Sequence, residues 1–150
     1  MEPKPRAKIG VVVPCYNSGK YLANTLESIA AQTMTNWLCV IVDDASTDNT
    51  ADIAQCFVAR DHRFELIAIP WAGVSVVRNS GFAALRGRCE YVIFLDSDDL
   101  WHPETLTTLF NLIKENPNAP AVMGAADFMD ENENPIDASS LDPHIHRRVQ

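Results

Sequence analysis

The sequence is poor in basic residues. Its 150 residues include 12 Lys and Arg against 20 Asp and Glu, which gives a net charge of −8. Nucleic-acid-binding domains and polybasic membrane-surface modules both need clustered positive charge. This balance argues against both classes, and no nucleic-acid partner is expected. A phosphorylated ligand can still bind such an acidic protein where a cation bridges the two.

Long apolar runs, a secretion signal and paired cysteine motifs are also missing. Every apolar stretch is well short of the ~18 residues that span a bilayer, and the charged N-terminus lacks the hydrophobic core of a signal peptide. The four cysteines form no C-x-x-C pair, and three lie inside apolar runs, where a free thiol packs as a small hydrophobe. We therefore expect a reducing, cytoplasmic location without a transmembrane segment in this chain, leaving open peripheral attachment at the inner membrane face in a longer protein.

Glycine-rich phosphate loops are absent as well. There is no G-x-x-x-x-G-K-[ST] motif, and the first turn between a strand and a helix holds only Gly19 instead of G-x-G-x-x-G. The charge of a phosphate ligand would therefore be neutralised by a metal ion, so the candidate ligand is a metal-chelated diphosphate.

The chain instead alternates short strands with longer helices. Strands are predicted at 9–13, 37–42, 64–69, 91–95 and 121–124, and helices at 21–30, around 53–58, at 74–85 and at 103–116. This alternation predicts βαβ units and an α/β fold with a mostly parallel sheet. Pro14 is expected to stop the first strand and Pro103 to be the first residue of the last helix. The apolar fourth strand is expected to be buried on both faces.

One domain accounts for most of the chain. We predict an N-terminal tail at 1–8, the α/β domain at 9–129, and at 130–150 a polar loop or the start of a second part that the chain does not finish.

Acidic residues follow the strands at one edge of the predicted sheet. Asp43 and Asp44 follow the second strand, and Asp96, Asp98 and Asp99 follow the fourth. In parallel sheets the ligand crevice lies outside the carboxyl ends of the strands. Packed carboxylates repel one another, and a hard divalent cation with oxygen ligands, Mn²⁺ or Mg²⁺, would neutralise them.

Other residues near this edge suit a nucleotide, but each has a plainer explanation. Tyr16 offers an aromatic face and Asp44 offers acceptors for a base N–H, whereas Tyr16 could simply pack and the first acidic group could form turns or cap a helix. Three acids within four positions, at Asp96, Asp98 and Asp99, exceed what capping needs. His144 and His146 are best explained as part of a solvated loop.

At this point the sequence resembles the N-terminal part of a family 2 glycosyltransferase with the GT-A fold. The similar stretches are IGVVVPCYNSGKYLANTLESIAAQT, VIVDDASTDNT and AGVSVVRNSGFAALRGRCEYVIFLDSDDLWHPETL, in the family's order and spacing. The resemblance implies a Rossmann-like sheet whose first four strands have the order 3-2-1-4, with helices on both faces. It also implies an inverting, metal-dependent transfer of sugar from a nucleotide-diphosphate donor. The combination of Asp44 and Tyr16 favours UDP as the nucleotide of that donor. The implied acceptor is a saccharide or a lipid-linked molecule of cell-envelope polysaccharide synthesis.

The resemblance also implies a role for each site residue. Those implied to bind the nucleotide are Pro14, Tyr16, Asp43, Asp44, Arg78 and Asp96. Asp98 is implied to hold the metal, with Asp96 and Asp99 as further candidates for that role. The general base of the family lies beyond residue 150, so we expect a fragment that is inactive alone and that self-associates or keeps the segment from Asp130 mobile. Ala45, where the family often has Gly, counts as a mild departure.

The sequence leaves two other functions open. A non-catalytic module would bind the sugar nucleotide without turnover. A receiver-like or phosphatase-like α/β domain would handle phosphate on an aspartate and would need a Lys or Thr partner at later strand ends, for which the sequence offers no matching set.

Overall fold

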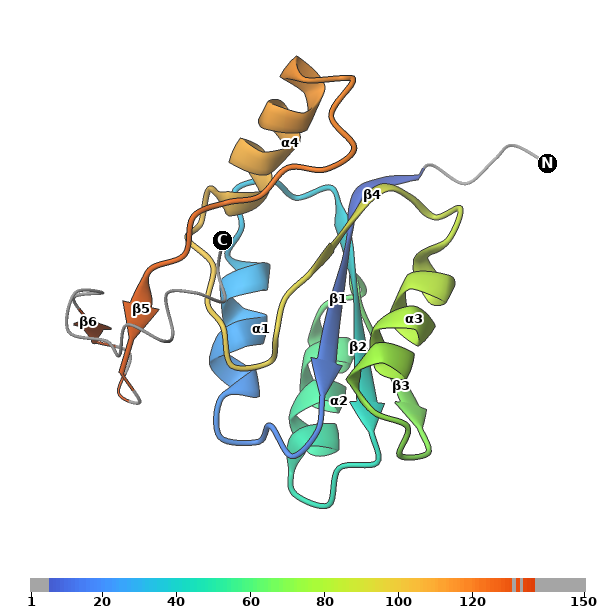
Figure 1. The fold of residues 1–150 in the computed structure, drawn as a ribbon. Helices are drawn as coiled ribbons and strands as arrows, with labels where there is room; N and C mark the ends of the chain where they lie inside the picture. The colour runs from blue at the N-terminus through green and yellow to red at the C-terminus, as the bar shows by residue number, and fades with distance from the viewer. Residues whose placement is uncertain (1–5, 131, 133, 137–150) are drawn as a thin grey trace.

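The architecture is a parallel sheet with helices packed on it (Figure 1). The structure is a computed structural model, and it describes residues 6–130, 132 and 134–136. The helices and strands are, in chain order, β1 (Ala7–Cys15), α1 (Leu22–Ala30), β2 (Trp37–Asp44), α2 (Thr50–Arg60), β3 (Phe64–Ile69), α3 (Val74–Leu85), β4 (Cys89–Phe94), α4 (Thr105–Glu115), β5 (Phe128–Met129) and β6 (Pro135–Ile136).

The main sheet has four strands in the order β3-β2-β1-β4, and every neighbouring pair is parallel. This confirms the predicted order 3-2-1-4. Because the strands are parallel, their carboxyl ends meet at one edge, the lower edge in Figure 1. β5 and β6 form a separate antiparallel pair.

Both faces of β1 and β2 are buried, which explains the continuous apolar runs at their centres, rich in Val and Ile. Successive side chains of a strand point to opposite faces. Val11 and Val13 therefore lie in a core cluster with residues of α1 and α2, whereas Val12 lies in a second cluster with Val77 and Leu85 of α3. Helices thus cover both faces, as predicted.

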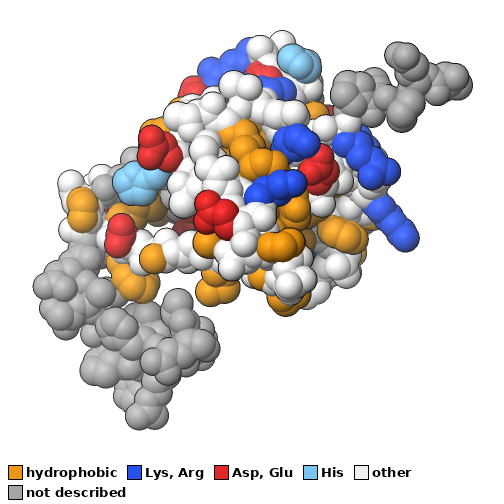
Figure 2. Space-filling view, turned by 90° about the horizontal axis from the view of Figure 1, so that it is seen from above, with side chains coloured by type: hydrophobic (Ala, Val, Ile, Leu, Met, Phe, Trp, Pro, Cys, Tyr) orange, Lys and Arg blue, Asp and Glu red, His pale blue; other side chains and the backbone are white. Residues whose placement is uncertain are grey.

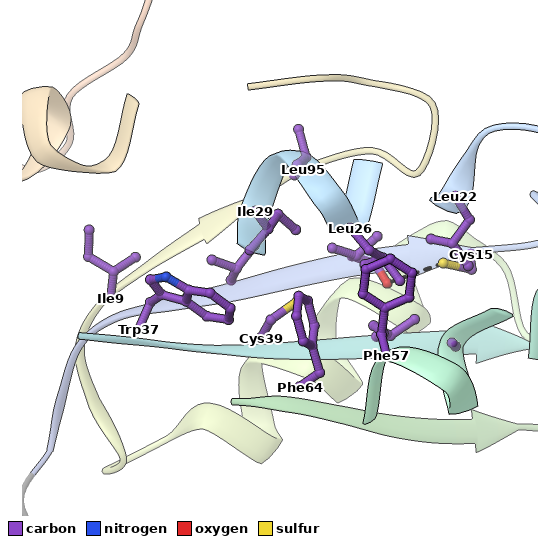
Figure 3. Packing of buried hydrophobic residues seen from close by; sticks show 14 of the residues in the cluster. Ile9, Cys15, Leu22, Leu26, Ile29, Trp37, Cys39, Phe57, Phe64 and Leu95 are labelled. Carbon is purple, nitrogen blue, oxygen red and sulfur yellow. Dashed lines mark hydrogen bonds between the residues drawn. The ribbon is translucent and has the colours of Figure 1, made fainter. Parts of the chain in front are cut away.

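An aromatic group organises the larger cluster (Figure 3). The ring of Phe64 lies 5.2 Å from that of Trp37 and 5.5 Å from that of Phe57, both edge to face. The guanidinium of Arg63 covers the Trp37 ring at 3.9 Å. These contacts join β2, β3 and α2 and help to hold the two strands in register.

Cys15 lies in the same cluster, and its thiol is a packing group. Its Sγ lies 3.7 Å from the carbonyl of Val13, shown as the dashed line in Figure 3. Burial, with a smaller contribution from the Asp43 charge, raises the pKa of the Cys15 thiol to about 12. All four cysteines are free thiols.

α3 approaches the sheet closely at Gly81. A Cβ added there would lie 2.4 Å from Cγ1 of Val12 and 3.2 Å from Cγ2 of Val42. The absence of a side chain at this position lets α3 lie directly on β1 and β2.

Two predictions about the strands were wrong. Pro14 does not stop β1, because the strand continues to Cys15 with Pro14 opposite Val42. β4 pairs with β1 only as far as Val12, so Pro14 lies where β1 has a partner on one side, and its missing N–H costs nothing there. β4 is not buried on both faces, since it is the sheet's edge and Phe94 is 43% exposed.

Two predictions about the C-terminal third were also wrong. No strand forms at 121–124; the first strand after α4 is β5. Pro103 lies in the turn before α4, whose N-cap is Glu104, and its carbonyl accepts hydrogen bonds from Thr33. Within the described residues no helix is long and apolar enough to cross a bilayer, the longest having 12 residues. The predictions for His144 and His146 lie outside the described residues.

Candidate functional site

The loops after β1 and β2 are tied to each other by side chains. The amide of Asn17 donates to Oγ of Ser46 at 2.9 Å, and Oδ1 of Asn17 accepts from the amide of Thr47 at 2.8 Å. The amide of Ser18 donates to Oγ1 of Thr50 at 2.8 Å. The P-x-Y-N turn and the D-D-x-S-x-D-x-T segment therefore form one rigid unit.

Asp48 completes this unit. Its Oδ2 accepts from the amide of Gly19 at 2.9 Å, while its Oδ1 accepts from the hydroxyl and the amide of Thr50. The Thr50 hydroxyl, followed by these amides, lowers the pKa of the Asp48 carboxyl. A Cβ at Gly19 would lie 1.9 Å from Oδ1 of Asn49 and 2.9 Å from Oδ2 of Asp48, so a larger residue there would displace these loop side chains. Asp48 is thus a structural residue of the loop, whereas the N-cap of α2 is Asn49, which makes no side-chain capping bond.

Both loops contain a residue in the left-handed backbone region, Asn17 with φ of 49° and Ala45 with φ of 57°. Asn tolerates this region, but a Cβ makes it unfavourable for Ala. Ala45 is therefore a costlier departure from glycine than the sequence alone suggests.

The two acids at the end of β2 are buried and engaged with backbone amides. Asp44 accepts from the amides of Ala72 and Gly73, at 2.7 and 2.9 Å, one on each carboxylate oxygen. Asp43 accepts from the amide of Ser46 at 3.3 Å. Asp44 thereby fixes the turn that leads from β3 into α3. Each of its oxygens keeps a further acceptor position for a ligand.

Tyr16 is an exposed aromatic residue of this edge, as is Trp71 after β3. It follows β1 directly and is 53% exposed, while Pro14 beneath it is buried in the strand. A tyrosine held at a strand end with half of its surface in water is not a core residue. It offers a flat apolar face, the feature a nucleotide base needs for stacking.

Arg78 of α3 and Asp96 after β4 form an ion pair, with Nη2 2.5 Å from Oδ1. Both side chains are more than a third exposed, so the pair contributes little stability. The Nε atom of Arg78 is buried without a hydrogen-bond partner. The structure therefore brings these two predicted nucleotide-binding residues together.

Asp98 and Asp99 lie in the loop after β4 and are exposed. They line a hollow of about 410 Å³ whose other walls come from α1 and from residues 127–130, including Tyr21 and Asp127. The carboxyl of Asp99 is partly shielded from water although the residue as a whole is exposed. This shielding, reinforced by the Asp98 and Asp96 charges, raises its pKa. Repulsion between neighbouring carboxylates is thus the smaller cause of the raised pKa of Asp99.

The donor set fits a divalent cation that is shared with a ligand. Within the part of the chain that the structure describes, no group of three or more His, Cys, Asp or Glu side chains is arranged to hold a metal. Mg²⁺ and similar ions, however, are commonly held by one or two carboxylates while substrate phosphates and water complete the shell. Asp98 and Asp99 meet that requirement, whereas Asp96 is paired with Arg78.

The charge of the molecule differs between the two ends of the sheet. Carboxylates gather at the carboxyl ends of the strands. Figure 2 looks onto the opposite end and shows Lys and Arg side chains there. Lys8, near the start of β1, is paired with Glu90, and Arg88, just before β4, is paired with Glu65. These two basic side chains are thus paired and lie near the strand starts, away from the candidate site.

Sequence reasoning missed the residues that hold the site loops, chiefly Asn17, Ser46 and Thr50. Their signal was present, because short polar side chains in turns bond to nearby backbone. What the sequence could not show is that these bonds join two loops about 30 residues apart.

The fold and this site define a class of protein. A parallel sheet in the order 3-2-1-4, covered by helices on both faces and with its polar residues at the carboxyl ends of β1, β2 and β4, is the Rossmann-like GT-A fold. A receiver-like sheet has the order 2-1-3-4-5, with the third strand beside the first. Here β4 occupies that place, so the receiver-like alternative does not fit.

Comparison with known proteins identifies the family. The model of glycosyl transferase family 2 matches residues 10–147, and the chain belongs to this family. Staphylococcus aureus TarP, a poly(ribitol-phosphate) beta-N-acetylglucosaminyltransferase, is 37% identical over 121 residues, which cover 78% of this chain and 36% of TarP.

Solved structures agree. S. aureus TarS 1–349 in complex with UDP has a TM-score of 0.65 and 34% identity, covering 72% of this chain and 32% of that one. The mannosyltransferase PcManGT of Pyrobaculum calidifontis, in complex with GDP-Man and Mn²⁺, has a TM-score of 0.64 and 25% identity, covering 73% and 33%. The chain spans half or less of the length of the curated relatives it matches first.

Proposed function

We propose that this chain is the donor-binding part of an inverting, metal-dependent glycosyltransferase. The donor is a nucleotide-diphosphate sugar, UDP-linked, and the acceptor is a saccharide or a lipid-linked molecule. The observation that carries the proposal is the arrangement at the carboxyl edge. An exposed aromatic face at the end of β1 lies beside a buried carboxylate at the end of β2 and an exposed acidic loop after β4.

The nucleotide base is proposed to stack on Tyr16. Asp44 accepts from the base N–H with the acceptor positions that its bonds to Ala72 and Gly73 leave free. Uracil and guanine both carry such an N–H on the pairing edge, and of the two we favour uracil, as in UDP. The UDP complex of the similar protein TarS supports this choice.

Arg78 and Asp96 are proposed to flank the ribose and phosphates. The ion pair sets the direction of both side chains. A ligand that replaces one partner of the pair loses little binding free energy, because an exposed pair contributes only about 0–1 kcal/mol. The buried, unpartnered Nε of Arg78 adds a donor that a ligand oxygen could satisfy.

Asp98, with Asp99 beside it, is proposed to hold a divalent cation against the diphosphate. When bound, such an ion neutralises the charge that develops on the leaving diphosphate. Both aspartates lie at the hollow in front of α1, which leaves them accessible to the ion and to the donor together. The Mn²⁺ complex of PcManGT supports this proposal.

The transfer step itself also needs a general base for the acceptor hydroxyl and a cleft that orients the acceptor. We propose that both lie outside these 150 residues, so that the chain binds the donor without transferring the sugar. The poly(ribitol-phosphate) specificity in the name of TarP supports an acceptor of the cell-envelope polymer type.

A thermal-shift panel tests the proposal. The melting temperature is measured with Mn²⁺ and each of UDP, UDP-sugars, GDP and GDP-mannose. A ligand present at 100 times its Kd stabilises by about 2.7 kcal/mol, or roughly 5–10 °C for a domain of this size. UDP and a UDP-sugar are expected to give this shift and GDP a smaller one. The absence of a shift with every nucleotide diphosphate would refute donor binding.

A receiver mimic and a turnover assay complete the test. Beryllofluoride should leave the melting temperature unchanged, because the chain lacks a phosphorylated aspartate site. Acceptor-dependent release of UDP by the 150-residue chain would show that the base lies within it, with Asp127 and Asp130 as the first residues to replace.

A further inference from the structure

The acidic loop after β4 is held near both of its ends by polar side chains of α1 and the turns that flank it. Oγ1 of Thr25 donates to the carbonyl of Ser97 at 2.9 Å, and Oγ of Ser18 lies 2.7 Å from Oγ of Ser97. Further along, Oγ of Ser28 accepts from the amide of Trp101 at 3.2 Å.

Gln32 closes the far end of the loop. Its Nε2 donates to the carbonyl of His102 at 2.7 Å, and its Oε1 accepts from the amide of Leu106 at 2.9 Å. The loop is therefore joined to the first turn of α4 through one side chain. We call Ser18, Thr25, Ser28 and Gln32 the loop clamp.

Three of the four clamp residues occupy buried positions where apolar side chains would be more favourable. Thr25 is fully buried, Gln32 is 4% exposed and Ser18 is 8% exposed, and Thr25 lies on the same side of α1 as the core residues Leu22, Leu26 and Ile29. Buried polar groups are tolerated where they are hydrogen-bonded. What these groups supply is a fixed path for a loop that has no regular secondary structure between β4 and α4.

The hydrogen bond from Thr25 reaches the loop between two of the site carboxylates. Ser97 lies between Asp96 and Asp98, so the peptide units that carry these two carboxylates meet at the residue that the clamp holds. A second constraint, the bond from the Asp99 amide to the Asp96 carbonyl at 3.1 Å, closes the loop on itself.

We propose that Thr25, together with Gln32, is a positioning residue that fixes the acidic loop in the conformation that receives the metal-bound diphosphate. This inference rests on the proposed function. The clamp residues do not touch the ligand; they act through the backbone of the loop. Without the Thr25 bond the loop samples other conformations, and the apparent Kd rises by the inverse of the competent fraction.

The closing experiment compares three single variants and the unmodified chain. Thr25→Val removes the hydroxyl at nearly constant volume, and Thr25→Ser keeps it. Thr107→Val is the matched control, because it removes a hydroxyl on α4 that lies 3.0 Å from the hydroxyl of Thr33 and leaves the acidic loop untouched. UDP affinity is measured by calorimetry in Mn²⁺ and in EDTA, and amide hydrogen exchange is measured at Asp99 and Trp101.

We expect Thr25→Val to weaken UDP binding in Mn²⁺ about tenfold, as for a loop that is competent about a tenth of the time. Binding in EDTA should change little, exchange at Asp99 and Trp101 should quicken, and Thr25→Ser and Thr107→Val should resemble the unmodified chain. If Thr25→Val does not fold, Ser28→Ala replaces it, since it removes the acceptor for the Trp101 amide, together with the bond from Oγ of Ser28 to the carbonyl of Thr25 within α1.

Three results would overturn the inference. The first is unchanged exchange at Asp99 and Trp101, which would mean that the clamp does not hold the loop. The second is faster exchange with unchanged affinity in Mn²⁺, and the third is an equal loss in Mn²⁺ and in EDTA. If the unmodified chain itself gains no affinity from Mn²⁺, the proposed function fails and this inference fails with it, whatever the exchange shows.

Discussion

Replacing Gly81 with alanine tests how closely α3 must approach the sheet. In an exposed helix this change is favourable by about 1 kcal/mol, because glycine is the poorer helix former. Here the new Cβ would lie 2.4 Å from Cγ1 of Val12, a fully buried and conformationally stiff side chain. Either Val12 or the whole of α3 must move.

The expected net effect follows from these two opposing contributions. Overpacking of a core by one methyl group typically costs about 1–3 kcal/mol, and a contact this short places the cost in the upper half of that range. Subtracting the helix-propensity gain leaves Gly81→Ala less stable by about 1–2 kcal/mol. Since α3 carries Arg78 one turn earlier, UDP binding should weaken too.

Urea unfolding of Gly81→Ala, Val12→Ala and the double variant measures both the sign and the cause. Val12→Ala opens space for the new methyl group, so the double variant should lose about 2 kcal/mol less than the two single losses added together. A stabilised Gly81→Ala, or strict additivity in the double variant, would refute the close-packing argument.

Two further predictions concern stability. Ala45→Gly should raise the free energy of unfolding by about 0.5–1 kcal/mol, because it relieves a positive φ of 57°; an unchanged urea midpoint would contradict this. Asp61→Asn should lower the free energy of unfolding at pH 7 by about 1 kcal/mol. The reason is that hydrogen bonds from Arg63, whose Nη2 lies 2.7 Å from Oδ2 of Asp61, lower the pKa of Asp61. That contribution is present above the unfolded pKa of about 3.9 and disappears as the pH falls through the lower folded pKa, so the two proteins should differ at pH 7 and converge in acid.

The sequence predicted the main sheet because its signals are local. The β-branched runs that became β1 and β2, the apolar run of β3 and the helix closed near Gly87 all depend on patterns within about ten residues. β3 and α3 were predicted with the bounds that the structure shows.

The errors arise where neighbours decide the outcome. The apolar run of β4 suggested burial on both faces, but no sequence pattern says that a strand is the last of its sheet. The segment 121–124 has strand-forming residues, yet a strand also needs a free partner in register, and none pairs with it in the described structure.

The candidate site was predicted in part. The position of Asp43, Asp44 and Asp98 at strand ends followed from the α/β pattern, and the structure places Arg78 against Asp96. The loop clamp could not be predicted, because Thr25 and Ser97 lie 72 residues apart and such a bond depends on the packing of α1 against the loop.

The most direct test of the account is the affinity of UDP for the unmodified chain and for Asp98→Ala, each titrated in Mn²⁺ and in EDTA. An acidic rim repels a free diphosphate, so binding should be weak in EDTA and tighter in Mn²⁺ for the unmodified chain. Asp98→Ala should lose the gain from Mn²⁺ and keep the affinity seen in EDTA, whereas Tyr16→Ala should weaken binding equally under both conditions. Equal affinity of the unmodified chain in EDTA and in Mn²⁺ would contradict the metal-binding role of Asp98 and with it the central claim.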